Sequence, residues 1–128
     1  MALNNQARKS LIAGTFLLAM AVLIGAFGAH GLKNLVEEAK LVTFETGVRY
    51  HFYHGLALIL LGLCQQLLPA LKSSVAYHAF LVGILLFSFN CYFYALTSEK
   101  AFAMIVPVGG VLFMVGWIAW CWELWKKA

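Results

Sequence analysis

Four long apolar stretches constrain the fold of this chain more than any other feature. They are residues 10–28, 52–71, 75–96 and 101–122. The hydrocarbon core of a bilayer is about 30 Å thick, and a helix rising about 1.5 Å per residue needs about 20 apolar residues to cross it. Because each stretch has roughly that length, we expect four membrane-spanning helices in a single transmembrane domain covering residues 1–128.

Composition also indicates that lipid is the solvent. Hydrophobic residues make up 63% of the 128 residues and charged residues 11%, against about half and about a quarter in soluble domains. A soluble core of this size cannot hide so much apolar surface. The basic lead of Arg8 and Lys9 resembles that of a signal peptide, but the apolar run after it is longer than a signal core. We therefore expect the first stretch to be a retained helix.

The Lys and Arg residues near the spans predict the orientation. Four spans place both termini on the same side as the loop around Lys72. That side carries five basic residues (Arg8, Lys9, Lys72, Lys126 and Lys127), and the other carries four (Lys33, Lys40, Arg49 and Lys100). The first span has its basic residues directly before it. We therefore expect a multi-pass protein of the inner (plasma) membrane with both termini in the cytoplasm.

The longest connection lies between the first and second spans. In it, Leu32, Leu35, Val36 and Ala39 recur at helical spacing, while charged residues face the other way. This pattern predicts a short amphipathic helix lying on the membrane surface. Thr43 is then placed to cap a second helix that begins near Phe44.

Small residues spaced by seven predict how the helices pack. Lipid does not push helices together, so close packing depends on small residues that let backbones approach. A seven-residue repeat keeps these residues on one face of a helix. The residues are Gly14, Ala21, Gly28, Gly55, Gly62, Gly83, Gly109 and Gly116. The predicted fold is an all-α, antiparallel, four-helix transmembrane bundle.

Polar residues near the span ends form the candidate site. Placed by depth, they fall in one layer at the outer end of the bundle, the end opposite the termini. The predicted cluster consists of His30, Arg49, His54, Asn90, Glu45 and Tyr94. A structural role is the alternative for each: Glu45 and Arg49 have the spacing of a local ion pair, and an amide in hydrocarbon needs partners on another helix.

The sequence predicts no catalytic residue, metal or cofactor. No Ser or Cys has a base at a defined spacing, and there is no phosphate-binding loop. His51 and His54 have the spacing to chelate from one helix, with His30 as a third ligand, but no carboxylate within the spans completes a site. A haem held between His30 and His54 is a weaker alternative.

Three motifs resemble those of a known family. They read Gly-Ala-Phe-Gly-Ala-His-Gly-Leu from Gly25, Thr-Gly-Val-Arg-Tyr-His-Phe-Tyr-His from Thr46, and Pro-Val-Gly-Gly from Pro107, followed by a Gly-Trp pair at residues 116–117. The chain resembles the small bacterial membrane proteins of domain-of-unknown-function family 423, which are similar to the transmembrane protein 256 family. The resemblance implies a multi-pass inner-membrane protein and no established activity. Residues 89–94 depart from the Gly-Ser pair and aliphatic residues of that family.

The predicted function is therefore that of a non-enzymatic structural or accessory membrane protein. Its expected partners are membrane lipid and either further copies of the chain or a larger membrane complex; nucleic acid is not expected. Two alternatives use the outer polar cluster. One is a small transporter or channel, and the other is a protein that binds a lipid or quinone between its helices.

Overall fold

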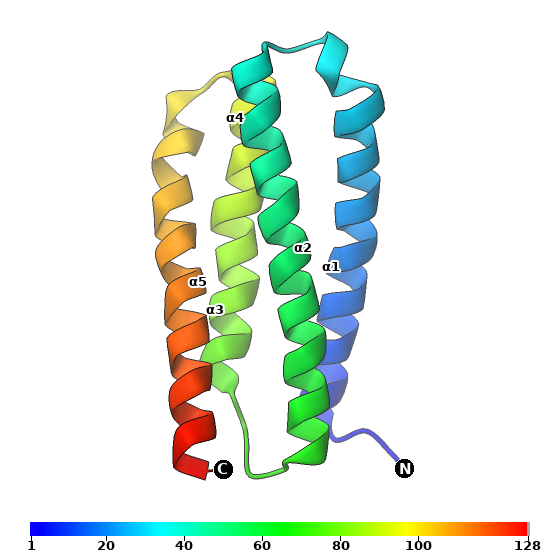
Figure 1. Cartoon of the computed structure of the whole chain (residues 1–128), viewed down its shortest axis with the longest axis vertical. Helices are drawn as coiled ribbons and strands as arrows, with labels where there is room; N and C mark the ends of the chain where they lie inside the picture. Colours follow the sequence, from blue (N-terminus) through cyan, green and yellow to red (C-terminus); the bar gives the residue numbers. More distant parts are fainter. Residues whose placement is uncertain (128) are drawn as a thin grey trace.

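The computed structural model describes residues 1–127 and consists of four antiparallel helical rods (Figure 1). The third rod is continuous, with a short π-helical segment between two α-helical parts. The elements are α1 (Asn5–His30), the 3₁₀ turn η1 (Leu32–Asn34), α2 (Glu38–Leu67), α3 (Ser74–Ile84), the π-helical η2 (Leu85–Phe89), α4 (Asn90–Thr97) and α5 (Lys100–Lys127). The predicted all-α antiparallel four-helix bundle is confirmed.

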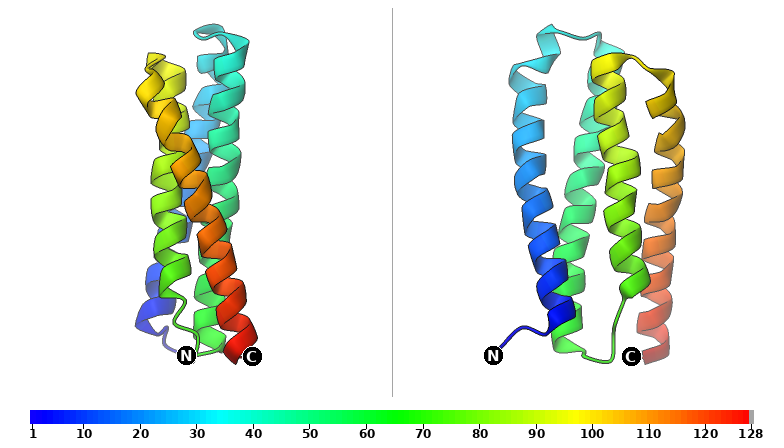
Figure 2. Two further views of the ribbon diagram at one scale, coloured as in Figure 1. Left: turned by 90° about the vertical axis from the view of Figure 1, so that its left-hand side faces the viewer. Right: turned by 180° about the vertical axis from the view of Figure 1, so that it is seen from behind.

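The rods are arranged as two hairpins. α1 packs chiefly against α2, and α5 packs chiefly against the rod formed by α3, η2 and α4. α2 and the third rod are neighbours at the centre, so α1 and α5 lie at opposite edges (Figures 1 and 2). Both termini lie at the same end of the bundle, as the sequence predicts for an even number of rods.

Three stretches of the described residues are long and apolar enough to cross a membrane: Asn5–Asn34, Ser74–Thr97 and Lys100–Lys127. They contain the first, third and fourth predicted spans. α2 is also long, at 30 residues, but polar side chains such as His51, His54 and Gln65 interrupt its apolar run and point into the bundle. Its crossing of the bilayer therefore stays a prediction.

The first connection differs from the predicted amphipathic surface helix. Only the single turn η1 forms there, and α2 begins at Glu38 rather than near Phe44. The physical reason is that Leu32 is fully buried in a cluster with Phe44 and Tyr92, so it faces the bundle instead of the bilayer. Thr43 is not a cap, because it lies inside α2 and its hydroxyl donates to the Ala39 carbonyl at 3.1 Å.

The predicted small residues lie where helices meet. A methyl group added at Gly14 would be 2.8 Å from the Gly55 carbonyl oxygen, so α1 and α2 approach backbone to backbone there. At two other contacts a glycine accommodates an aromatic ring, Gly28 that of Phe44 and Gly83 that of Phe113. The remaining predicted positions, Ala21, Gly62, Gly109 and Gly116, are also buried. These contacts set the spacing of the rods.

The π-helical segment η2 divides the third rod into two parts that contact α2 and α5 to different extents. A π turn contains more residues than an α turn, so it shifts the faces of the helix that follows. Before η2, α3 packs mainly against α5, where Phe80 lies against Gly116. After η2, α4 also packs against α2, where Cys91 lies against Gly47. One rod can thus pack closely against both neighbours.

Candidate functional site

The polar residues predicted to share the outer layer lie at different depths. His30 ends α1 at the outer end, whereas His54 lies about 24 Å along α2 from Glu38. The Gly14–Gly55 contact also places His54 near the middle of the bundle. The prediction was wrong on this point because it began the second span at residue 52, which moved His54 too close to the outer end, whereas α2 begins at Glu38. Within residues 1–127, no hydrogen bond joins two members of the predicted cluster.

The charged members of the cluster lie on the surface. Glu45 and Arg49 are both exposed and border a shallow hollow of about 280 Å³ next to Gly25 and Ala29. Arg49 donates to the Thr46 hydroxyl at 3.2 Å. The predicted Glu45–Arg49 ion pair does not form, since the ion pair found among the described residues joins Glu123 and Lys127. His30 is exposed as well.

Asn90 has a structural role in the third rod. Its side-chain amide donates to the carbonyl oxygens of Leu85 and Leu86, each at 3.1 Å. These carbonyls belong to the π-helical segment, where the regular α-helical hydrogen-bond ladder is interrupted. The amide therefore satisfies the backbone of its own rod instead of facing another helix. Tyr94, one turn further along, is half-buried.

His54 is the member of the cluster that joins two rods. It is buried on α2, and its ring stacks on Phe113 of α5 with the ring centres 3.5 Å apart and 7° between the planes. Its Nδ1 lies 2.8 Å from the Tyr50 carbonyl oxygen, and the Trp117 indole N–H donates to its Nε2 at 3.0 Å. A carbonyl only accepts and an indole N–H only donates. The neutral ring with its proton on Nδ1 satisfies both partners.

A groove between α2 and α5 begins at this histidine. Its volume is about 640 Å³, and its lining is mostly aromatic and aliphatic. The residues that shape it are Tyr50, Tyr53, His54, Phe87, Phe113 and Trp117. Tyr53 and Trp117 are exposed, so the groove lies at the surface of the bundle.

Sequence reasoning missed the partner of His54. Trp117 lies about 26 Å along α5 from Lys100, which matches the depth of His54 along α2. α2 and α5 both run antiparallel to the third rod, so they begin at the same end of the bundle. Counting residues from the helix starts at Glu38 and Lys100 would have placed His54 and Trp117 at one level. An indole N–H in hydrocarbon also needs an acceptor. Depth matching was therefore the signal that could have found the pair.

A second buried polar contact was also missed. His51 is fully buried, and its Nδ1 lies 3.0 Å from the Tyr92 hydroxyl. Among the same described residues, His51 Nε2 and the Ser88 hydroxyl have no hydrogen-bond partner. Since His51 faces α4 and His54 faces α5, the two rings do not converge on one metal ion.

The structure does not bring together the ligands that the metal and haem hypotheses require. Among residues 1–127, no three side chains of His, Cys, Asp or Glu come close enough to hold a metal ion. His30 ends α1 at the outer end while His54 lies near mid-bundle, so they do not form a pair at matching depth. The buried histidines therefore contribute hydrogen bonds and ring stacking to the site.

The comparisons with known proteins agree with the all-helical, apolar architecture. A family described as "Protein of unknown function (DUF423)" matches residues 24–110. The chain belongs to this family. The DUF423 match covers the first two sequence motifs and Pro107–Gly110, and it stops before Trp117.

Curated relatives of this DUF423 chain are named as membrane proteins. UPF0382 membrane protein SAB0533 of Staphylococcus aureus (strain bovine RF122 / ET3-1) is 39% identical over 108 residues, which is 84% of this chain and 88% of that protein. UPF0382 membrane protein YwdK of Bacillus subtilis is 37% identical over 84% of this chain and 89% of its own length. A UPF0382 membrane protein of Haemophilus influenzae is 36% identical, with 77% and 78% covered.

These names and the apolar helices establish a membrane protein of a family whose function is unknown. No solved structure matches the chain. The similarity to the transmembrane protein 256 family stays a prediction.

Proposed function

We propose that this chain is a non-enzymatic protein of the inner membrane that associates, through α5, with further copies of itself or with a larger membrane complex. Both termini lie in the cytoplasm. Support comes from the polar side chains, most of which bond to nearby backbone or to a neighbouring rod, as Asn90 and His54 do. An arrangement of this kind holds helices together and does not present reactive groups to a substrate.

The observation that carries the proposal is the unpacked face of α5. α5 packs chiefly against the third rod, contacts α2 at His54 and lies at an edge of the bundle (Figure 2), and its apolar side chains Met104, Val108, Val111 and Ile118 are exposed. Transmembrane helices associate through shape and close packing. Gly110 and Val111 give this face a region without large side chains, next to the groove at His54.

Matched substitutions at the two edges test the proposal. Ile118 on α5 and Leu23 on α1 have exposed fractions of 69% and 73%. A tryptophan at either position is tolerated by lipid, but it disrupts a closely packed interface. We expect the wild-type chain, tagged and extracted in mild detergent at native expression, to migrate as an assembly larger than a 14.2 kDa monomer. Ile118→Trp should reduce that assembly, and Leu23→Trp should not.

The proposal would be contradicted if the wild-type chain were a monomer after this extraction and no other protein were purified with it. Equal effects of Ile118→Trp and Leu23→Trp would contradict the role given to α5. Blue-native electrophoresis and mass measurement in detergent give the two readouts.

A second candidate function uses the groove at His54. Its volume of about 640 Å³ lies in the range of small-molecule sites, which are mostly apolar with a few polar groups. Tyr50, Tyr53 and Trp117 line the groove and are exposed, so their rings provide surfaces on which a flat ring can stack. We therefore propose a quinone or a lipid as an alternative ligand of this groove.

Trp117 borders the groove and can report on such a ligand. A bound quinone should quench tryptophan fluorescence in a saturable way, and Gly110→Leu, which fills the groove, should remove the saturable part. Quenching that grows linearly with quinone in both forms would exclude this candidate.

A further inference from the structure

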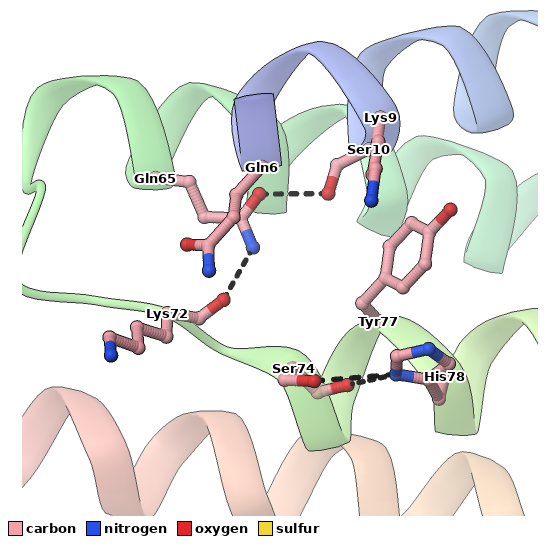
Figure 3. A pocket seen from close by; sticks show the side chains of 8 residues that line it. All are labelled: Gln6, Lys9, Ser10, Gln65, Lys72, Ser74, Tyr77 and His78. Carbon is pink, nitrogen blue, oxygen red and sulfur yellow. Dashed lines mark hydrogen bonds between the residues drawn. The ribbon is translucent and has the colours of Figure 1, made fainter. Parts of the chain in front are cut away.

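A polar pocket lies at the opposite end of the molecule from the predicted cluster, near the two termini. It has a volume of about 160 Å³ and lies between the beginning of α1, the end of α2 and the beginning of α3 (Figure 3). Its lining includes Lys9 and Ser10 from α1, Gln65 from α2, Lys72 from the connection, and Ser74 and Tyr77 from α3. Neither the family match nor the predicted cluster includes Lys9 or Ser10.

The base of this pocket is rigidly built. Ser10 and Gln65 are 1% and 2% exposed. The Ser10 hydroxyl donates to Gln65 Oε1 at 2.8 Å, and Gln65 Nε2 donates to the Lys72 carbonyl oxygen at 2.8 Å. These two bonds tie α1, α2 and the connection together (Figure 3). The pocket is therefore preformed, and its buried amide already has both partners.

Two groups in the pocket, the Lys9 ammonium and the Tyr77 hydroxyl, are free to donate hydrogen bonds, and the side chains of Gln6 and His78 complete the lining. The Lys9 ammonium forms no ion pair among residues 1–127, and Figure 3 shows it beside Ser10 and facing Tyr77. The Tyr77 hydroxyl also forms no hydrogen bond to another residue in that part of the chain. The Lys72 side chain extends away from the other groups, so its ammonium adds charge at the rim. A site of this kind suits an anion with several acceptor oxygens.

No carboxylate lines the pocket. Glu123, just past the expected fourth span, lies on the other side of the connection, where it accepts from the Lys72 N–H at 3.0 Å and from the Lys127 ammonium at 3.1 Å. Its negative charge is therefore compensated by the Lys127 ammonium, which lies outside the pocket.

The pocket lies at the expected membrane boundary. Lys9 directly precedes the first predicted span, and Ser74 directly precedes the third. Lipid phosphates lie at this depth, and basic pockets between transmembrane helices on the cytoplasmic side bind anionic head groups. We propose that this pocket binds the phosphodiester of an anionic phospholipid, with Lys9 and Tyr77 as its principal ligands.

Lipid retention by the full-length chain tests the proposal. The probes are phosphatidylglycerol and phosphatidylcholine, each added to the protein in neutral detergent, with retained lipid counted by native mass spectrometry. We expect one phosphatidylglycerol to be retained preferentially. Lys9→Gln removes one charge-assisted bond and should weaken retention about tenfold. Tyr77→Phe removes only a hydroxyl and should weaken it less.

Arg8→Gln is the matched control for charge. Arg8 is the neighbour of Lys9 and changes the net charge equally, but it does not line the pocket. It should leave preferential retention largely intact. Equal losses in Lys9→Gln and Arg8→Gln, or equal retention of the two lipids by the wild-type chain, would overturn the proposal. Displacement of phosphatidylglycerol by millimolar inorganic phosphate would identify a free-phosphate site and overturn the assignment to lipid.

Discussion

At the scale of single residues, the imidazole of His54 is held by one hydrogen-bond acceptor and one hydrogen-bond donor. The Tyr50 carbonyl needs a proton on Nδ1, and the Trp117 indole needs a lone pair on Nε2. A second proton would break the bond to Trp117, and loss of the indole would leave a buried lone pair without a donor. The pair therefore links α2 to α5 only while the ring is neutral.

We predict that Trp117→Phe destabilises the bundle by about 1–3 kcal/mol, the usual cost of leaving one buried polar partner unsatisfied. Phenylalanine keeps most of the apolar contact and removes the N–H donor. Unfolding in mixed micelles, followed by circular dichroism as denaturing detergent is added, measures the change. Trp122→Phe is the control, because Trp122 is 57% exposed on the same helix. Equal stability of the two variants would show that the Trp117–His54 bond is not stabilising.

Individual residues were predicted less well than the helices that carry them. The sequence identified His54 and Asn90 as polar groups in hydrocarbon that need partners, and both have them. It did not identify those partners. The depth of His54 depended on where α2 begins, and the partners of Asn90 are carbonyls freed by a π turn. No pattern of residue types shows such a turn in advance.

At the scale of helices, Gly109 and Gly110 give a direct test of how closely α5 packs against the third rod. A methyl group at Gly109 would meet the backbone nitrogen of Phe87, whereas one at Gly110 would lie 3.8 Å from the Phe87 ring. We predict that Gly109→Ala destabilises the bundle by about 1–3 kcal/mol, because the two helices must separate. Gly110→Ala should be neutral or stabilising by up to about 1 kcal/mol.

The same detergent titration compares these two glycine variants. A Gly109→Ala variant as stable as wild type would mean that α5 and η2 do not approach as closely as the structure has them. If Gly110→Ala lost more stability than Gly109→Ala, the closest contact of α5 would lie on the face of Gly110 and not on that of Gly109.

The four rods and their antiparallel order followed from apolar length and from short connections, and those signals are strong because lipid leaves few other solutions. The first connection was harder. Its helical spacing of apolar residues was real, but Leu32 is buried against Phe44 and Tyr92, and tertiary packing decided the outcome. Periodicity alone does not distinguish a surface that faces lipid from one that faces a neighbouring helix.

At the scale of the whole molecule, the number of crossings decides where the termini lie. Length and apolar composition identify three spans among residues 1–127, while the structure has four rods with both termini at one end. We predict four crossings. Fluorescent-protein reporters that mature only in the cytoplasm should be bright at either terminus, and a cysteine at Asn34 should react with an impermeant maleimide in intact cells. A dark reporter at one terminus would contradict four crossings.

The pairing of α1 with α2 has a consequence for biogenesis. α2 carries two buried histidines and the buried Gln65, which make it a poor substrate for insertion alone, yet Gly14 and Gly55 let α1 lie directly against it. We therefore expect α2 to leave the translocon only as a helical hairpin with α1, so that the ribosome must have synthesised both before either settles in lipid. The second half of the chain would then assemble on a partner already in place.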